Sequence, residues 1–222
     1  MSLTTTRVSP VHDRLEALEA RFVERNGMAV AASIGESDAV LADAIGITDF
    51  SYLYKTGFKG INAAGWAKIQ GMVPPRPNGW SEASDGTIFA RLANSEFFVE
   101  DGAQAAWSAR IASALQQMPD GVCPVVRQDA GFALVGERLN DLFVETCSVD
   151  FRESQVDSVV MTTMVGVSVL VIRRDIGSRP CYRLWCDPTM APYLWDTIAE
   201  IALGLGGGPV GTDALLVAKP RT

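Results

Sequence analysis

Histidine and cysteine, the side chains that most often supply catalytic bases and nucleophiles, are scarce in this chain. There is one histidine, His12, and there are four cysteines: Cys123, Cys147, Cys181 and Cys186. A Ser-His-Asp or Cys-His system would have to use His12, which lies where we expect an amphipathic helix to begin and to run to about residue 27. The cysteines have no CxxC spacing, and Cys181 and Cys186, five apart in an expected strand, point to opposite faces. We therefore interpret His12 as a solvated residue and the cysteines as reduced, mostly structural thiols, and we expect no metal site.

Several carboxylates belong to the residue type that acid–base catalysis uses. Glu96 lies in an expected hairpin, and Glu100 and Asp101 precede a helix expected at about residues 103–118. A carboxylate at the start of a helix satisfies backbone amides that have no partner in the first turn. We therefore interpret Asp101 as a helix cap and assign no catalytic residue.

A glycine-rich segment, GLGGG at residues 204–208, contains a Gly-x-Gly sequence. A dinucleotide-binding loop needs a strand before its glycines and a helix after them, so that helix amides meet the pyrophosphate. Here the glycines follow an expected helix, which is typical of a helix C-cap. No GxxxxGK[ST] sequence is present. We expect the chain to bind no flavin or nucleotide cofactor by itself.

The composition indicates an acidic globular protein. The 222 residues include 19 Lys and Arg and 26 Asp and Glu, giving a formal net charge of −7, and 48% are hydrophobic. This balance excludes a disordered chain and argues against nucleic-acid binding, which needs clustered basic residues. Mean hydropathy is +0.14, which is consistent with an apolar surface for a partner. The uncharged stretch Ser158–Ile172 is shorter than the ~20 residues of a membrane helix, and residues 1–14 have no signal-peptide pattern, so we expect a cytoplasmic location.

The order of expected elements repeats along the chain. A strand, a glycine, a helix, further strands and a second helix occur twice, with Gly60 and Gly136 in corresponding places. Asp101 and Asp187 then precede the last helix of each copy. The sequence thus predicts an α+β fold of duplicated βαββα-type units, each with an antiparallel sheet and helices on one face. We expect an N-terminal helix–strand extension at residues 1–46 that packs on the core, a first unit at 47–121 and a second at 122–222.

Seven stretches of this chain resemble, in order and spacing, the gamma subunits of heterotetrameric sarcosine oxidases. They are DFSYLYKTGFKGINAAGW from Asp49, PPRPNGW from Pro74, RLANSEFFVED from Arg91, RQDAGFALVGERLNDLFVETCSVDF from Arg127 and, towards the C-terminus, GVSVLVIR, YRLWCDP and YLWDT. The resemblance extends from about residue 10 to residue 211. More distantly, the chain is similar to the aminomethyltransferase (T protein) of the glycine cleavage system, whose fold also contains an internal duplication.

The resemblance implies an accessory, non-catalytic subunit of a multi-subunit flavoenzyme that oxidises sarcosine or a similar N-methyl amine. Its partners would be the alpha and beta subunits and a small zinc-binding delta subunit, and these partners would hold FAD, FMN and NAD. In this chain the same resemblance implies no bound cofactor, with tetrahydrofolate as the one ligand that a T-protein-like pocket would take. The alternative is a stand-alone folate-binding protein of one-carbon transfer, similar to an aminomethyltransferase.

Asp85 is the residue that distinguishes the accessory subunit from the folate-binding protein. It matches the position of an acidic residue that T proteins place beside folate, although Gly86 stands where T proteins carry a second acid and the preceding Gly-Gly is missing. Asp-Gly is also a strong turn dipeptide, so Asp85 has a structural interpretation as well. For docking to a partner subunit we select Arg76 and Trp80 of the PPRPNGW loop, because Arg and Trp are enriched at binding hot spots. A loop packed on its own domain is the other interpretation of these two residues.

Overall fold

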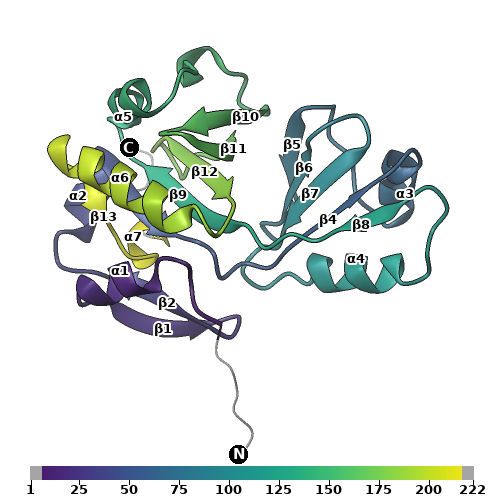
Figure 1. The fold of residues 1–222 in the computed structure, drawn as a ribbon, viewed down its shortest axis with the longest axis horizontal. Helices are drawn as coiled ribbons and strands as arrows, with labels where there is room; N and C mark the ends of the chain where they lie inside the picture. Colours follow the sequence, from purple (N-terminus) through teal and green to yellow (C-terminus); the bar gives the residue numbers. More distant parts are fainter. Residues whose placement is uncertain (1–6, 217–222) are drawn as a thin grey trace, which may run out of the picture. The chain divides into compact units, whose positions relative to one another are not determined.

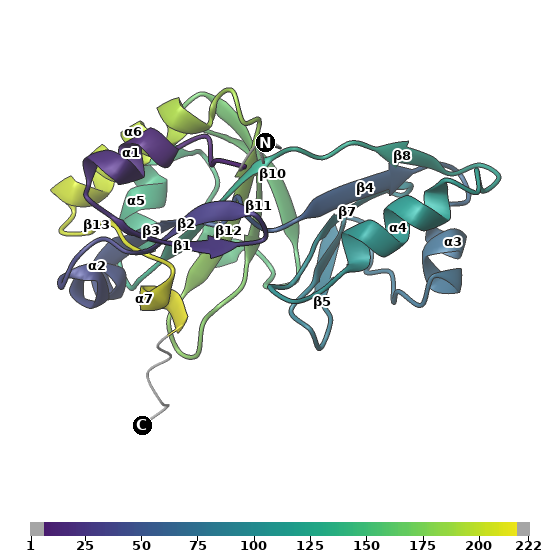
Figure 2. The same cartoon turned by 90° about the horizontal axis from the view of Figure 1, so that it is seen from below.

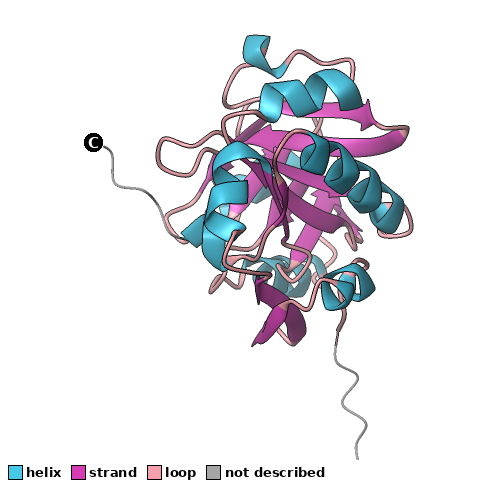
Figure 3. Ribbon diagram, turned by 90° about the vertical axis from the view of Figure 1, so that its left-hand side faces the viewer, coloured by secondary structure: helices cyan, strands magenta, loops and turns pink. Residues whose placement is uncertain are grey.

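The computed structural model describes residues 7–216, which divide into two compact units, each discontinuous in sequence. Unit 1 contains residues 7–52, 130–156 and 161–216, and unit 2 contains residues 53–129 and 157–160. Both units combine sheets of mainly antiparallel strands with helices, which confirms the predicted α+β class (Figure 3).

Unit 2 is a five-stranded antiparallel sheet with two helices (Figure 1). The strands lie in the order β5-β6-β7-β4-β8. Their core against the helices includes Phe58 and Phe97, whose rings stack with centroids 4.8 Å apart, and Trp66, which meets Phe58 edge-on. The elements are β4 (Lys55–Lys59), α3 (Ala63–Ile69), β5 (Gly79–Glu82), β6 (Ile88–Arg91), β7 (Glu96–Glu100), α4 (Trp107–Leu115) and β8 (Cys123–Val125).

Unit 1 contains a six-stranded sheet in the order β10-β11-β12-β9-β3-β13, and a separate two-stranded hairpin (Figure 2). Helices α5 and α6 pack on β9 and β12 through aromatic pairs such as Phe132–Trp195 and Phe143–Tyr182. The elements are α1 (His12–Ala17), β1 (Arg21–Arg25), β2 (Met28–Ser33), α2 (Asp38–Ile45), β3 (Gly46–Asp49), β9 (Ala130–Val135), α5 (Leu139–Thr146), the 3-10 helix η1 (Phe151–Glu153), β10 (Val159–Met164, whose first two residues belong to unit 2), β11 (Val167–Arg173), β12 (Cys181–Cys186), α6 (Ala191–Gly204), β13 (Gly208–Pro209) and α7 (Asp213–Leu216).

The two sheets repeat the same topology. The order β5-β6-β7-β4-β8 of unit 2 corresponds to β10-β11-β12-β9-β3 of unit 1. Gly60 after β4 and Gly136 after β9 have φ of +142° and +134°. A Cβ at either would lie about 2 Å from a backbone oxygen, 2.0 Å from that of Gly121 and 2.2 Å from that of Ala44. Glycine is required at both places, because the next chain segment passes directly against the turn.

In each sheet, the last strand of the repeated order comes from the part of the chain that precedes the other sheet. β3 pairs with β9 in unit 1 although it directly precedes β4, and β8 pairs with β4 in unit 2 although it directly precedes β9. The compact units therefore have bounds different from the expected 1–46, 47–121 and 122–222. The pairing partner of a strand is chosen by long-range contacts, and element order along the chain does not reveal it.

The predicted helix at the N-terminus is too long. Helix α1 ends at Ala17, and residues 21–33 form the β1–β2 hairpin. The turn residues Asn26 and Gly27 have φ of +51° and +69°, as a two-residue type I′ hairpin turn requires. The Asn-Gly dipeptide thus carried a hairpin signal that outweighed the helical spacing of Leu15, Leu18 and Phe22.

Candidate functional site

Asp85 lies in the turn between β5 and β6, as its Asp-Gly sequence predicts. Its Oδ1 accepts a hydrogen bond from the Thr87 amide at 3.0 Å, and its Oδ2 accepts one from Trp107 Nε1 at 3.1 Å. Gly86 has φ of +82° and donates its amide to the Ala83 carbonyl. Partial burial raises the pKa of Asp85, but the hydrogen bonds from Thr87 and Trp107 outweigh it, so the pKa lies below its ordinary value. Asp85 is therefore an ionised, exposed carboxylate that also ties the hairpin to α4.

Asp101 is buried at the end of β7, with 2% of its surface exposed. Its Oδ1 accepts hydrogen bonds from the amide and hydroxyl of Ser108, at 2.8 and 3.0 Å. Ser108 is the second residue of α4, so Asp101 accepts a hydrogen bond from a first-turn amide. The predicted position as the helix cap is wrong, because α4 begins at Trp107 and its N-cap residue is Ala106. Burial raises the pKa of Asp101, and the charges of Asp85 and Glu100 add to this in spite of the Ser108 hydrogen bonds.

The environments thus move the Asp85 and Asp101 pKa values in opposite directions, a feature of catalytic acid–base pairs. The contacts argue for a structural role, however. Asp101 directs its bonded oxygen to the helix start, and the Gly102 amide donates to Thr87 Oγ1 beside it. These bonds join the β5–β6 turn, the end of β7 and the first turn of α4.

A buried ion pair adjoins this group of residues. Lys55 Nζ lies 3.6 Å from Glu100 Oε2, and their side chains are only 3% and 1% exposed. Lys55 also donates to the Leu53 carbonyl at 2.9 Å. The sequence analysis did not select Lys55, because a lysine at the start of a strand usually extends into solvent and nothing in the pattern marks this one as buried.

The predicted docking residues lie close together in sequence. Arg76 is on the loop before β5, and Trp80 is the second residue of β5. Arg76 forms a double contact with Asp157, Nε–Oδ2 at 3.1 Å and Nη2–Oδ1 at 2.9 Å, and it also donates to Ser158 Oγ. The Trp80 amide donates to the Asp157 carbonyl, and the Trp80 residue is half-buried. The loop is thereby fixed to the segment at residues 157–160, while Arg76 stays exposed and its docking role stays a prediction.

The surroundings of the histidine and the cysteines agree only in part with the prediction: Cys181 and Cys186 are buried, but Cys123 is exposed. His12 begins α1, but its ring packs on Phe22 with centroids 4.9 Å apart and its Nε2 lies 3.3 Å from Glu16, so it is less solvated than predicted. All four cysteines are free. Burial raises the pKa of Cys181 to about 12, which makes that thiol unreactive.

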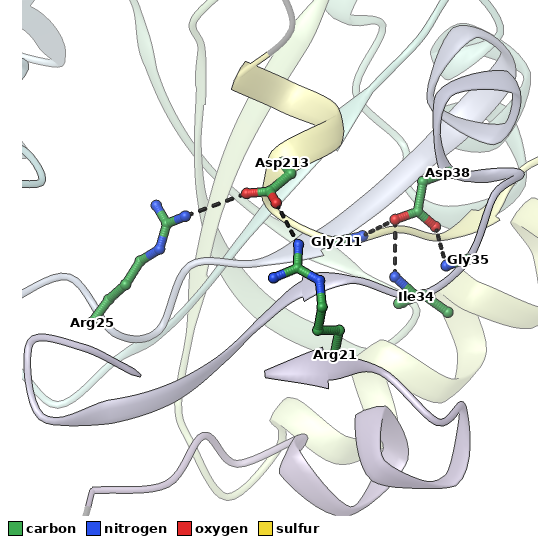
Figure 4. A network of polar contacts seen from close by, with 7 residues as sticks. All are labelled: Arg21, Arg25, Ile34, Gly35, Asp38, Gly211 and Asp213. Atoms are coloured by element: carbon green, nitrogen blue, oxygen red, sulfur yellow. Dashed lines mark hydrogen bonds and ion pairs between the residues drawn. The ribbon is translucent and has the colours of Figure 1, made fainter. Parts of the chain in front are cut away.

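A second polar network, in unit 1, was not selected from the sequence (Figure 4). Asp38 at the start of α2 accepts the amides of Ile34, Gly35 and Gly211 at 2.9, 3.0 and 3.1 Å. Asp213 accepts hydrogen bonds from both Arg21 and Arg25 of β1. The Asp38 carboxylate directs its bonds to three backbone amides, so this network fastens the C-terminal segment to the N-terminal elements and offers no catalytic group.

Neither a metal centre nor a membrane span emerges from residues 7–216. This part of the chain holds no group of three or more His, Cys, Asp or Glu side chains arranged for a metal ion. None of its helices has the length and apolarity needed to cross a membrane. The GLGGG segment ends α6, where the Gly206 and Gly207 amides donate to the Leu203 and Ala202 carbonyls, so its predicted capping role is confirmed.

Comparison with known proteins identifies the fold. No protein-family model and no curated protein sequence matches the chain. Among solved structures, it is similar to aminomethyltransferase T of the glycine cleavage system from Bartonella henselae, with a TM-score of 0.74 and 14% identity over 95% of this chain and 61% of that one. It is also similar to a chain of the heterotetrameric sarcosine oxidase from Corynebacterium sp. U-96, with a TM-score of 0.60 and 19% identity over 88% of this chain and 96% of that one. The chain spans about three-fifths of the aminomethyltransferase, and it has a T-protein-like fold, as the resemblance implied.

Proposed function

We propose that this chain is an accessory, non-catalytic, gamma-like subunit of a multi-subunit flavin-dependent enzyme that oxidises sarcosine or a related N-methyl amine. The observation that carries the proposal is the match to the heterotetrameric sarcosine oxidase, because 96% of one of its chains has a counterpart in 88% of this one. The flavin and dinucleotide chemistry would belong to partner alpha and beta subunits, with a small delta subunit completing the assembly.

The polar residues of unit 2 support this proposal. The two carboxylates closest to a catalytic pair, Asp85 and Asp101, bond to Trp107 and Ser108 of α4. Glu100 faces Lys55 in a buried ion pair. These groups hold the unit together, which is the function expected of polar residues in a subunit that contributes shape and surface to a complex.

The experiment is co-expression of the chain with alpha, beta and delta subunits of a sarcosine oxidase, followed by gel filtration and an assay of sarcosine oxidation. We expect the chain to co-elute with the flavoprotein subunits, and the chain purified alone to be colourless and inactive. Elution as a separate species in the presence of its partners, or stoichiometric flavin absorbance of the chain alone, would contradict the proposal.

The docking site within the proposal has its own test. Arg76→Ala combined with Trp80→Ala should weaken co-elution, because Arg and Trp are enriched at binding hot spots and Asp157 holds both residues in place. Asp157→Asn is the matched control, because it removes the charge that faces Arg76 but keeps the Arg76 and Trp80 side chains. Equal weakening by the control would show that loop anchoring matters, and unchanged co-elution of the double variant would place the interface elsewhere.

A second candidate function, folate binding in one-carbon transfer, is favoured by the higher TM-score of 0.74 to the aminomethyltransferase. Asp85 suits a folate donor group, because it is exposed and ionised, and a carboxylate can accept several hydrogen bonds besides those from Thr87 and Trp107. Under this alternative, tetrahydrofolate raises the melting temperature of the chain and Asp85→Ala abolishes the rise. Trp107→Phe is the control, since it removes the hydrogen bond to Asp85 and keeps the carboxylate. Under the accessory-subunit proposal we expect no rise with any of the three proteins.

A further inference from the structure

The sheet of unit 2 lacks the sixth strand that covers one edge of the sheet in unit 1. In unit 1, β13 lies outside β3 and pairs with it in parallel, with Pro209 beside Ile47. In unit 2, β8 takes the place of β3 and is the last strand of the sheet within residues 7–216 (Figure 1). The outer edge of β8 is therefore open at the place where its counterpart in unit 1 is covered by a further strand.

The sheet register identifies the residue of β8 that corresponds to the one holding β13. Ile47 of β3 and Pro124 of β8 each lie opposite the second residue before the shared glycine turn, so they occupy the same place. The Ile47 carbonyl accepts a hydrogen bond from the Val210 amide, directly after β13, at 2.9 Å. Neighbouring residues of a strand direct their N–H and C=O groups to opposite sides, so Pro124 and Val126 direct theirs to the outer edge. Because proline has no N–H, this edge offers the carbonyls of both residues and the amide of Val126.

A cavity lies beside this edge, on the face of the sheet that α4 covers. Its volume is about 470 Å³, and its lining includes Leu115 of α4, Pro124 and Val126. Pro124 pairs with Phe58, which packs in one core with Leu115, so a residue paired with Pro124 from outside would also direct its side chain to the α4 face. The two cations of the lining already form ion pairs with carboxylates of β7. An uncharged, apolar side chain therefore fits this place best.

We propose that the outer edge of β8 binds an extended, uncharged segment of another polypeptide chain. This segment pairs with β8 in parallel, as β13 pairs with β3, and directs an apolar side chain into the cavity beside Pro124. In strand addition of this kind, backbone hydrogen bonds give affinity and a side-chain pocket gives specificity. A twofold dimer would pair the β8 strands of two copies antiparallel, so the parallel direction favours a different segment. The docking loop lies at β5, the opposite edge of the sheet, and the proposal stands whether or not the chain belongs to a flavoenzyme.

The probe is a capped peptide with the sequence of residues 205–212, LGGGPVGT, because the structure shows this sequence in the same pairing in unit 1. It is titrated into the isotope-labelled full chain and followed by amide NMR shifts and hydrogen exchange. We expect the largest shifts at residues 123–128 and slower exchange of the Val126 amide, which donates to the added strand. Phenylalanine in place of the peptide's proline should bind about two- to tenfold more tightly, since it fills more of the cavity. No binding, shifts confined to β3, or weaker binding of the phenylalanine peptide would overturn the proposal.

Matched changes in the chain and in the peptide test the pairing itself. Val126→Pro removes the outward amide at an exposed position, so affinity should fall about fivefold or more, whereas Val126→Thr keeps the amide and should bind like the wild type.

In the peptide, N-methylation of the valine blocks the donor to the Pro124 carbonyl and should weaken binding. N-methylation of the glycine after it, whose amide points away from β8, should not. Undiminished binding by Val126→Pro, or equal effects of the two N-methylations, would overturn the proposal, and the peptide comparison decides even if Val126→Pro fails to fold. Dimerisation of the wild type that Val126→Pro abolishes would assign the edge to a second copy and overturn it too.

Discussion

The two repeats share a backbone plan and differ in their polar residues. In both, a strand ends in a glycine that a neighbouring segment crosses, and the strands follow the same order. The acids after the third hairpin strand of each repeat have different roles: Asp101 is buried and bonds to Ser108 of α4, whereas Asp187 is exposed and bonds to Thr189 two residues away. The comparison teaches that close backbone contacts are common to both repeats, while each repeat has its own polar contacts.

The largest effect should come from the shared feature. Gly60→Ala and Gly136→Ala would each place a Cβ about 2 Å from a backbone oxygen, 2.0 and 2.2 Å respectively, at a positive φ. We expect each to lower the free energy of unfolding by about 4 kcal/mol or more, because backbone strain and steric overlap add, and urea denaturation measures the loss. Gly65→Ala in α3 is the control, because no atom lies within 4 Å of its Cβ, and it should be neutral or stabilising. A small effect at only one of Gly60 and Gly136 would show that the repeats are not equivalent there.

A smaller effect should appear at a feature that unit 2 alone has. Glu100, the residue before Asp101, forms an ion pair with Lys55. The corresponding residue before Asp187 is Cys186, which lies opposite Ala130 in the sheet. Lys55→Met leaves the buried Glu100 without its cation and should cost about 3 kcal/mol. The double variant Lys55→Met, Glu100→Leu should recover most of this loss, since a buried ion pair contributes little beyond an apolar pair. If the single variant is as stable as the wild type, the pair is not buried as the structure shows.

The smallest effect concerns Asp101 and Asp187, which should change the pH dependence of the free energy of unfolding in opposite directions. Burial and neighbouring charges raise the pKa of Asp101, so its folded form binds a proton more tightly than its unfolded form. Its contribution is therefore present below the unfolded pKa of 3.8 and is lost as pH rises through the raised value. Hydrogen bonds from Thr189 lower the pKa of Asp187, so its contribution is present above 3.8 and is lost as pH falls through the lowered value.

The measurement is the free energy of unfolding between about pH 2.5 and 6 for the wild type, Asp101→Asn and Asp187→Asn. Relative to its Asn variant, the wild type should lose stability with rising pH at Asp101 and gain it at Asp187. The Asp187 difference should be the smaller of the two, because that carboxylate is exposed. Slopes of the same sign would contradict the distinction between the two acids.

Much of the fold was predictable because its signals are local. Alternating apolar residues, turn dipeptides and strand–Gly–helix order predicted the α+β class, the duplication, the equivalence of Gly60 and Gly136 and the Asp85-Gly86 turn. The predicted ends of the helices were less accurate. The last helix, expected from Asp187, begins at Ala191, because the Asp187 side chain closes a turn with Thr189 before the helix starts.

The sequence by itself determined the composition class, the scarcity of histidine and cysteine and the repeated order of elements, because each of these is a property of neighbouring residues. Only the tertiary structure decided which strands pair, and therefore that β3 and β8 are exchanged between the sheets. It also decided that Lys55 is buried against Glu100 and that Arg127 Nε lacks an acceptor. These outcomes depend on contacts between residues up to 89 positions apart, such as Gly46 and Val135 of the β3–β9 ladder, whose strands meet only when the whole unit packs.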